Sequence, residues 1–346
     1  MFENMKTPLV CICVPAYNAG LTLAETLDSI LGQTYGNLKI FIVDNASTDN
    51  TLEIADAYAK KDPRITVVRN DVNVGGEGNF TRCLQLATGE YTAIYHSDDI
   101  YTPRMVEEEV LFLEAHREAG AVFSMAVAID GKGREGRLYK LPAWLRAQNK
   151  DEYGFDDLFR AMLKYGNFLF CPAAMARTEV YRDRIKVWDA GNYGSSADGN
   201  VWLRIAQNFP IGIIDKPLLK YRISVSSFSY HAARGKTGPH NMFRVFNDYI
   251  KGPAAALMGA DERKDYEVLV LKDNINRAFN LLLSGKKKEA AALLPGVFRP
   301  GLILYGLRSP EHFRVLVSGY FVFLCLALPV NETIKKLLWK VKFSDA

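Results

Sequence analysis

Residues 38–49 carry the sequence LKIFIVDNASTD, in which an apolar run gives way to a polar loop. The run over residues 38–43 predicts a buried strand. The Asp, Asn, Ser and Thr residues of the loop over 44–49 are typical of a turn that leaves a strand. Apolar residues spaced three apart over 52–58 then predict a helix. The segment therefore predicts one strand–loop–helix unit of an α/β protein.

The same alternation continues on both sides of this unit. Short apolar runs predict further strands at 10–14, 65–68 and 91–95, and apolar residues at helical spacing predict helices over 23–31 and 80–87. Strand–helix–strand units at this spacing indicate a mainly parallel sheet flanked by helices. Ligands of such sheets bind beyond the carboxyl ends of the strands, which here carry Tyr17, Asp44 and Asp98.

Beyond residue 120 the pattern becomes mixed and then helical. Strands are predicted at 121–129, 211–214 and 218–223, with helices over 155–163 and 198–207. Residues 224–239 are rich in Ser, Gly, His and basic residues, which predicts a loop, and the remainder is helical by pattern. Because 346 residues are enough for two domains, we predict an α/β domain over 1–225 and a helical region over 226–346.

The composition is that of an ordinary globular protein. Hydrophobic residues make up 49% and charged residues 24% of the chain, which excludes collagen-like, coiled-coil and wholly disordered proteins. The net charge of +4 is too small to indicate a nucleic-acid partner. Five scattered cysteines without metal-site spacing are typical of a reducing compartment. Because residues 1–8 also lack the apolar stretch of a secretory signal, we predict a cytoplasmic protein.

An uncharged run of ~16 residues spans 315–330, short of the ~20 residues that a membrane-spanning helix needs. Lys335, Lys336, Lys340 and Lys342 follow it, a basic flank of the kind that anionic lipids attract. One interpretation is a buried helix of the second domain or a contact between two copies of the chain. The other, which we favour, is a re-entrant or interfacial helix at the inner face of the cell membrane.

Acidic residues follow two of the predicted strands. Asp44 follows the first strand described above, and the pair Asp98 and Asp99 comes shortly after the strand 91–95. An aspartate at a strand end is usually a turn former or a helix cap. Together, however, the three form a cluster of hard oxygen ligands that suits Mg²⁺ or Mn²⁺ on a diphosphate. The chain has no P-loop motif, and the glycine-rich stretch 75–78 does not follow a strand, which disfavours a dinucleotide site.

Six short motifs occur in one order along the first third of the chain. They are VPAYN at 14–18, SILGQTY at 29–35, IVDNASTD at 42–49, NVG at 73–75, ATGEY at 87–91 and SDD at 97–99. In this order the motifs resemble those of the family 2 glycosyltransferases, which have the GT-A fold. The resemblance covers residues 8–105, with a weaker likeness to about 225. It implies an inverting enzyme that uses a nucleotide-diphospho sugar, and it says little about which sugar is transferred.

The resemblance also implies roles for single residues. The nucleotide would be held at the ends of neighbouring segments by Pro15, Ala16, Tyr17, Asn18, Asp44, Asn73, Gly75, His96 and Ser97. Asp98 would bind a divalent cation, Mn²⁺ or Mg²⁺, that holds the donor diphosphate. His96 stands where the family has the first aspartate of its Asp-x-Asp motif. A neutral imidazole could still bond a ribose hydroxyl there, and a partly buried structural histidine is the alternative.

Inverting transfer also needs a base that takes the proton of the acceptor hydroxyl. The family places this carboxylate at the start of a helix in the second half of the catalytic domain. Asp198 stands there, in the sequence SSADGNVWLR at 195–204. The alternative for Asp198 is a helix cap, and Asp189 is the next candidate base. We expect Asp198 and Asp98 to face one shared cleft.

Four further residues are candidates for contacts with the acceptor or with phosphates. They are Asp99, Arg204, Arg222 and His231. His231 belongs to a loop over 226–240 that could close over the diphosphate. For the two arginines, a structural ion pair or an exposed position is the alternative.

The leading hypothesis is an inverting, metal-dependent glycosyltransferase of the hexosyltransferase type that acts in surface polysaccharide synthesis. Its donor would be a nucleotide-diphospho sugar, expected to be UDP-linked, and its acceptor a glycan or a lipid-linked oligosaccharide. One alternative is a nucleotide-sugar-binding protein without transferase activity, in which His96 marks a degraded metal site. Another is a nucleotidyltransferase, which residues 16–21 disfavour because they contain no basic residue.

Overall fold

A computed structural model of the chain describes residues 7–223, 235–328 and 336. The chain divides into two compact units, an α/β unit of Met1–Leu158 with Asn167–Arg222, and a helical unit of Phe159–Gly166 with Ile223–Ala346. The short stretch Phe159–Gly166 therefore belongs to the helical unit, although residues of the α/β unit follow it in the sequence. The domain boundary between residues 225 and 226 stays a prediction.

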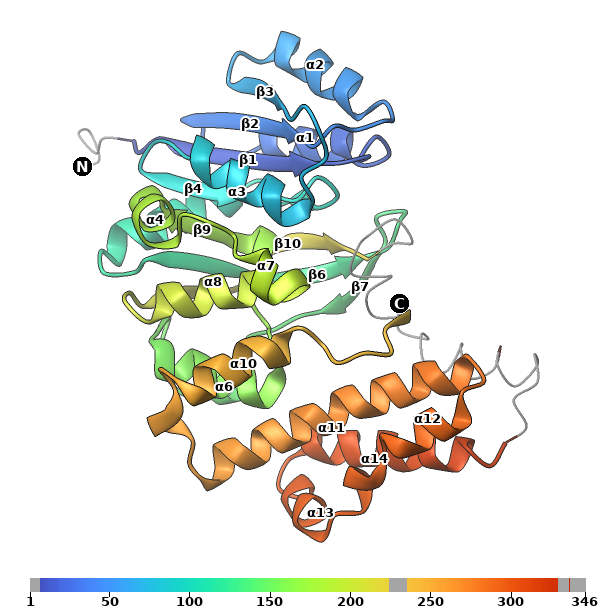
Figure 1. The fold of residues 1–346 in the computed structure, drawn as a ribbon. Helices are drawn as coiled ribbons and strands as arrows, with labels where there is room; N and C mark the ends of the chain where they lie inside the picture. The colour runs from blue at the N-terminus through green and yellow to red at the C-terminus, as the bar shows by residue number, and fades with distance from the viewer. Residues whose placement is uncertain (1–6, 224–234, 329–335, 337–346) are drawn as a thin grey trace. The chain divides into compact units, whose positions relative to one another are not determined.

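The α/β unit is built on one ten-stranded sheet (Figure 1). Its strands are β1 (Val10–Ala16), β2 (Leu38–Asp44), β3 (Ile65–Arg69), β4 (Tyr91–Ile94), β5 (Ile100–Tyr101), β6 (Ala121–Ile129), β7 (Glu135–Leu138), β8 (Glu152–Tyr153), β9 (Ala174–Arg177) and β10 (Ile211–Arg222). Eight of them lie in the order β3-β2-β1-β4-β9-β6-β10-β5, while β7 pairs with β6 and β8 with β10. Strands β1 to β4 run parallel, β6 and β10 form a second parallel pair, and β9 joins the two groups antiparallel. The mainly parallel α/β sheet expected from the sequence is confirmed.

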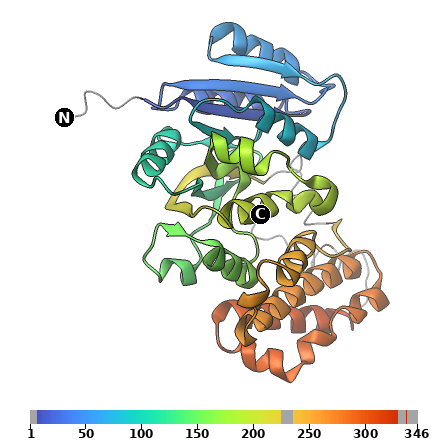
Figure 2. The same cartoon turned by 60° about the vertical axis from the view of Figure 1, so that its left-hand side comes forward.

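Helices pack around this sheet (Figures 1 and 2). They are α1 (Leu23–Leu31), α2 (Thr51–Lys61), α3 (Gly76–Leu86), α4 (Met105–Ala115), α5 (Ala143–Arg146), α7 (Ala190–Tyr193) and α8 (Ala197–Ala206), with short 3₁₀ or π segments η1 (Cys171–Ala173), η2 (Val180–Ile185) and η3 (Gly194–Ser196). Most of the residues of α6 (Phe155–Tyr165) belong to the helical unit. Residues 10–14 of β1 are fully buried although successive side chains point to opposite faces of the sheet. Both faces are therefore covered at β1, which explains its continuous apolar sequence.

Strand β10 corrects one expectation. The two strands predicted at 211–214 and 218–223 are a single strand, which pairs with β6 along its length. Its register shifts on both sides of Pro217, which has no N–H to donate to the ladder. The proline and its irregularity interrupt the apolar pattern, and the interruption resembles a break between two strands.

The described part of the helical unit contains five further α-helices. They are α10 (Met242–Lys251), α11 (Ala260–Leu283), α12 (Lys287–Ala292), α13 (Pro300–Gly306) and α14 (Pro310–Cys325), with 3₁₀ turns η4 (Ala255–Leu257) and η5 (Pro295–Phe298). Buried side chains of α11, among them Leu271 and Ile275, share one core with Leu316 and Val322 of α14. Gly319 permits this close packing, because a Cβ atom there would lie 2.9 Å from Ile275 Cδ1.

The apolar run predicted at 315–330 begins inside α14, and its last two residues lie outside the described part of the chain. Among the described residues, no helix combines the length and the apolar character that a membrane crossing requires.

Candidate functional site

The loops that follow β1 and β2 are tied into one platform. The two strands pair in register up to Ala16 and Asp44, so their carboxyl ends lie side by side. The Asn18 N–H donates to Ser47 Oγ at 3.0 Å, and the Thr48 N–H donates to Asn18 Oδ1 at 2.8 Å. Asn18 adopts a left-handed φ of 49°, which asparagine tolerates better than most residues. Pro15 and Ala16 end β1 on this platform, and the exposed Tyr17 belongs to it as well.

Asp44 presents a carboxylate oxygen that has no partner. The residue is 2% exposed, and its Oδ2 accepts a hydrogen bond from the Ser47 N–H at 3.2 Å. Its Oδ1 is buried and accepts no hydrogen bond. A buried acceptor without a partner is costly. An N–H group of a bound nucleobase would satisfy it.

Asn73 and Gly75 lie in a loop that Asn45 anchors to the end of β2. Asn45 Nδ2 donates to Asn73 Oδ1 at 2.9 Å and to the Gly75 carbonyl at 3.1 Å. Asn45 Oδ1 accepts from the Val74 N–H at 3.0 Å. Gly75 has a φ of 79°, a conformation that favours glycine. The sequence analysis missed Asn45 as the anchor, although it stands next to Asp44 within a recognised motif.

His96, Asp98 and Asp99 form a cluster that fits a divalent cation. One possible ligand atom from each residue lies within 4.8 Å of the others. His96 Nδ1 is 3.8 Å from Asp99 Oδ2, while His96 Nε2 and Asp99 Oδ2 are buried without a hydrogen-bond partner. A bound metal ion would satisfy these unpartnered atoms, and their combination of oxygen and nitrogen ligands suits a divalent cation. Ser97, between them, is half-buried.

Burial governs the protonation of this cluster. It lowers the pKa of His96 to about 4, so that the imidazole is neutral at pH 7 and keeps a free lone pair. Burial also raises the pKa of Asp98. The pKa of Asp99 is raised well above its ordinary value, first by burial and then by the neighbouring Asp98 carboxylate. Adjacent carboxylates that resist ionisation are stabilised in their charged form by a bound cation.

Arg222 braces the turn that carries the two aspartates. Its backbone N–H donates to Asp99 Oδ1 at 2.7 Å, and its Nε donates to the Asp98 carbonyl at 2.7 Å. The guanidinium also binds the Asp130 carbonyl and the Glu25 carboxylate, and the residue is 3% exposed. The structure thus assigns Arg222 to protein contacts, and Asp99 is fully buried. Neither residue is open to an acceptor, contrary to the expectation from the sequence.

Arg204 also differs from that expectation. Its Nη2 donates to the carbonyl oxygens of Arg184 and Ile185, both at 3.0 Å, which ties α8 to η2. The structural alternative therefore describes this arginine. His231 lies outside the described residues.

Asp198 lies in the first turn of α8 and is half-buried. Its Oδ2 accepts a hydrogen bond from Asn167 Nδ2 at 3.2 Å. Burial raises the pKa of Asp198 to about 6, and the hydrogen bonds from Gly199 N–H and Asn167 act in the opposite direction. A carboxylate with a pKa close to neutrality is suited to general-base work. Asn167 was missed in the sequence because nothing local distinguishes it.

Cys171 links the two groups of carboxylates. The pKa of its thiol is raised by burial and then by the negative charges of Asp198 and Asp99. Electrostatic shifts of this kind come from nearby charges. Both carboxylates therefore act on the Cys171 thiol, although they are far apart in the chain. A shared cleft between Asp98 and Asp198 stays a prediction.

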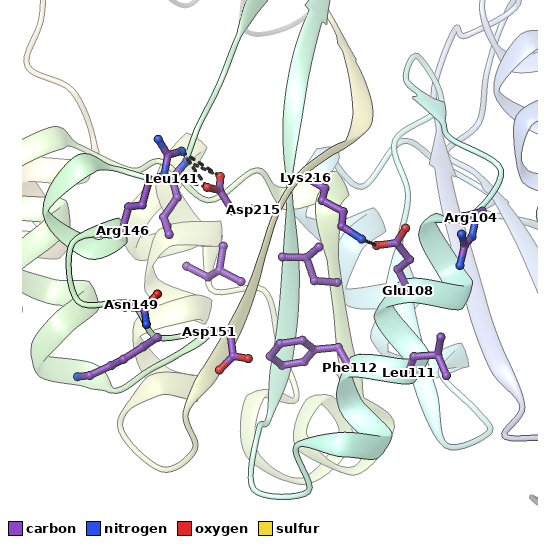
Figure 3. A pocket seen from close by; sticks show the side chains of 13 residues that line it. Arg104, Glu108, Leu111, Phe112, Leu141, Arg146, Asn149, Asp151, Asp215 and Lys216 are labelled. Atoms are coloured by element: carbon purple, nitrogen blue, oxygen red, sulfur yellow. Dashed lines mark hydrogen bonds and ion pairs between the residues drawn. The ribbon is translucent and has the colours of Figure 1, made fainter.

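A separate cavity of about 600 Å³ lies in the α/β unit and is drawn in Figure 3. Its walls come from α4, the segment 141–151 and residues 213–216 of β10. Figure 3 shows two ion pairs among its charged side chains, Lys216 with Glu108 at 2.6 Å and Arg146 with Asp215 at 2.9 Å. Its lining includes no site residue predicted above. The unpartnered carboxylates, and not this cavity, therefore mark the candidate active site.

Comparison with known proteins gives a consistent picture. The family model described as Glycosyl transferase family 2 matches residues 11–184. The chain is 39% identical to EpsE of Bacillus subtilis over 130 residues, which are 37% of this chain and 47% of EpsE. It is 29% identical to the glycosyltransferase MJ1057 of Methanocaldococcus jannaschii over 64% of this chain and 73% of that protein. It is 28% identical to WfaP of Escherichia coli, named as a UDP-Glc:α-D-GlcNAc-diphosphoundecaprenol β-1,3-glucosyltransferase, over 57% of this chain and 70% of that one.

Two solved structures illustrate the fold of the chain. TarS of S. aureus, residues 1–349 in complex with UDP, has a TM-score of 0.52 and 16% identity over 90% of each chain. The mannosyltransferase PcManGT of Pyrobaculum calidifontis, in complex with GDP-Man and Mn²⁺, has a TM-score of 0.52 and 21% identity over 93% of this chain and 86% of that one. These likenesses confirm the fold that the sequence motifs implied.

Proposed function

The chain belongs to Glycosyl transferase family 2, and on that premise we propose that it is an inverting, metal-dependent hexosyltransferase. The observation that carries the proposal is the cluster of His96, Asp98 and Asp99, whose unpartnered atoms suit a divalent cation. Asp198, whose pKa is raised to about 6, supplies a candidate base. A cation site and a base of this kind are the two groups that a sugar transfer with inversion requires.

The donor would lie across the ends of β1 and β2. The platform residues Tyr17 and Asn18 would support the nucleotide. Asp44 Oδ1 would accept a hydrogen bond from an N–H group on the edge of the base. His96, Asp98 and Asp99 would hold a Mn²⁺ or Mg²⁺ ion, which when bound neutralises negative charge on the leaving diphosphate. Arg222 keeps the aspartate turn in place through its backbone and guanidinium contacts.

Asp198 would act on the acceptor. The acceptor hydroxyl attacks the anomeric carbon from the side opposite the diphosphate, so that configuration is inverted. As the new C–O bond forms, the bond to the nucleotide diphosphate breaks, and the hydroxyl proton moves to the Asp198 carboxylate. The hydrogen bond from Asn167 Nδ2 to Asp198 Oδ2 orients the carboxylate and favours its ionised form, in which it can take the proton.

We further propose a UDP-linked donor and an acceptor that is a glycan or a lipid-linked oligosaccharide at the cytoplasmic face of the membrane. The UDP complex of TarS supports the donor, and the activity for which WfaP is named supports an acceptor on a lipid diphosphate. Because PcManGT was solved in complex with GDP-Man, GDP-linked sugars are tested as donors as well.

A panel of UDP-, GDP- and dTDP-linked sugars tests the proposal. We expect one donor class to release nucleotide with Mn²⁺ or Mg²⁺, and we expect chelation of the metal to slow the release roughly a hundredfold. Failure of every donor with either metal would overturn it. Calorimetric binding of UDP without turnover by any acceptor would favour the non-catalytic sugar-nucleotide-binding alternative, which the histidine at position 96 motivates.

A further inference from the structure

The helical unit exposes an apolar surface on α13, α14 and the neighbouring turns. We call it the C-terminal apolar face; its exposed members are Phe298, Leu304, Leu307, Phe313, Val317, Tyr320, Phe321, Phe323, Leu324 and Leu328. Leu324 is 69%, Leu304 68% and Leu307 61% exposed. Side chains of this size are seldom left in water as a group, and such a group marks an interaction surface.

The face follows the period of a helix. Phe313, Val317, Tyr320 and Leu324 stand at intervals of four, three and four residues, so they form one stripe along α14. The opposite side of α14, with Leu316 and Val322 among its residues, packs into the core with α11. The exposed stripe is therefore surplus to the fold of the helical unit.

Basic residues accompany the apolar face. Over residues 298–328 the sequence contains three arginines, Arg299, Arg308 and Arg314, but only one acidic residue, Glu311. All three arginines are exposed, and Arg308 also pairs with the exposed Asp261 of α11 at 3.4 Å. Apolar side chains among basic ones complement a bilayer with anionic headgroups, because the apolar groups enter the acyl boundary while the cations meet the phosphates.

The dimensions of α14 decide how it would meet a bilayer. Its 16 residues extend over ~24 Å at a rise of ~1.5 Å per residue, less than the ~30 Å of a hydrocarbon core. A helix of this length with one apolar stripe lies in the interface plane instead of crossing it.

We propose that the C-terminal apolar face docks the chain in-plane on an anionic lipid surface. The inference rests on the proposed function and deepens it, since it names the surface by which the transferase would reach a lipid-linked acceptor. Of the two interpretations of the run at 315–330, the exposed stripe favours an interfacial helix over a fully buried one.

Cosedimentation of the full chain with lipid vesicles tests this proposal without any donor or acceptor. We expect binding to vesicles of phosphatidylcholine with about 30% phosphatidylglycerol and weak binding to phosphatidylcholine alone. The double variant Leu304→Glu/Leu324→Glu should lower the affinity at least about tenfold, since each apolar side chain no longer enters the bilayer. The matched control is Leu111→Glu on α4, which is 55% exposed in the α/β unit and should bind like the parent.

The charge requirement has its own pair of variants. Arg308→Gln/Arg314→Gln should lower binding about tenfold, and added salt should weaken binding by the parent chain. Arg117→Gln/Arg134→Gln changes two arginines that are 79% and 77% exposed in the α/β unit and should have little effect.

Three outcomes would overturn the proposal. They are no preference for anionic vesicles, equal losses in the Leu111 control, and a dimer in sedimentation velocity that Leu304→Glu/Leu324→Glu dissociates, which would assign the face to a second copy. Nucleotide release measured without vesicles reports on the proposed function separately. A chain that binds vesicles but transfers no sugar, or the reverse, would thus distinguish the two failures.

Discussion

The two units of the chain differ in what they leave unsatisfied. In the α/β unit the buried polar atoms without hydrogen-bond partners include Asp44 Oδ1, His96 Nε2 and Asp99 Oδ2, and its exposed apolar side chains, such as Leu21 and Leu111, are scattered over separate elements. In the helical unit the core is closed, but a stripe of apolar side chains on α14 stands in solvent. Unpartnered buried polar atoms call for a charged or hydrogen-bonding ligand, whereas exposed apolar surface calls for an apolar one. The difference suggests that chemistry and docking are divided between the units.

The variant with the largest expected effect is Asp198→Asn, which tests whether the α/β unit carries the chemistry. The amide keeps the size of the side chain but cannot take a proton from the acceptor, so sugar transfer should fall by about 10³-fold. The binding of donor nucleotide and of anionic vesicles should stay at the parent level. Steady-state transfer with the active donor measures the effect.

Asp189→Asn is the matched control, because it alters the other aspartate considered as a base. It should change the transfer rate by less than about threefold. If Asp198→Asn retains a rate within about tenfold of the parent while Asp189→Asn does not, the base has been assigned to the wrong residue.

The positions of Asp44 and Asp98 in the candidate site could be predicted from the sequence. Residues 10–14 and 40–43 are continuous apolar runs because both faces of the sheet are covered, and in a parallel sheet their ends meet at one edge. Asp44 and Asp98 could therefore be placed at that edge from their position after predicted strands. The order of the motifs then indicated the family.

The remainder depends on contacts between distant segments. Arg222 reaches the Asp98 carbonyl across 124 residues of sequence, and Asn167 meets Asp198 across 31. No local pattern distinguishes an arginine that braces a turn from one that faces a phosphate. The single strand β10 was missed for a related reason, since a proline within a ladder resembles a strand end.

Gly319→Val tests the packing of α14 within the helical unit. A Cβ at this position would lie 2.7 Å from Val297 Cγ2 and 2.9 Å from Ile275 Cδ1, so α14 must move away from α11. We expect the free energy of unfolding of the helical unit to fall by about 1–3 kcal/mol, as for other overpacked cores. Urea denaturation followed by circular dichroism measures it.

The neighbouring Ser318→Val is its control, because residue 318 is exposed and the change removes the hydrogen bond from Ser318 Oγ to the Arg314 carbonyl within the helix, at a cost of about 0.5 kcal/mol. Nucleotide release at room temperature should be the same in both variants. An equal loss of activity and stability in Gly319→Val would contradict the division of labour between the units.

The smallest expected effect is a shift in pH dependence. Because Asp198 has a pKa raised to about 6 and acts only when ionised, kcat/KM should be constant above that pH and fall about tenfold per unit below it. The Asn167 amide favours the ionised form, so Asn167→Ala should move the inflection to higher pH.

Asn167 also accepts a hydrogen bond from the Leu169 N–H at 3.1 Å, so its loss could loosen the loop as well. The inflection separates the two effects, because a loosened loop lowers the plateau without moving the pKa of Asp198. Asn192→Ala, which removes the amide beside Asp189, should leave the inflection in place. A parent profile with its inflection near ~4, the ordinary value for aspartate, would mean that burial does not tune this carboxylate. The cluster of His96, Asp98 and Asp99 would then be the remaining evidence that the α/β unit carries the chemistry.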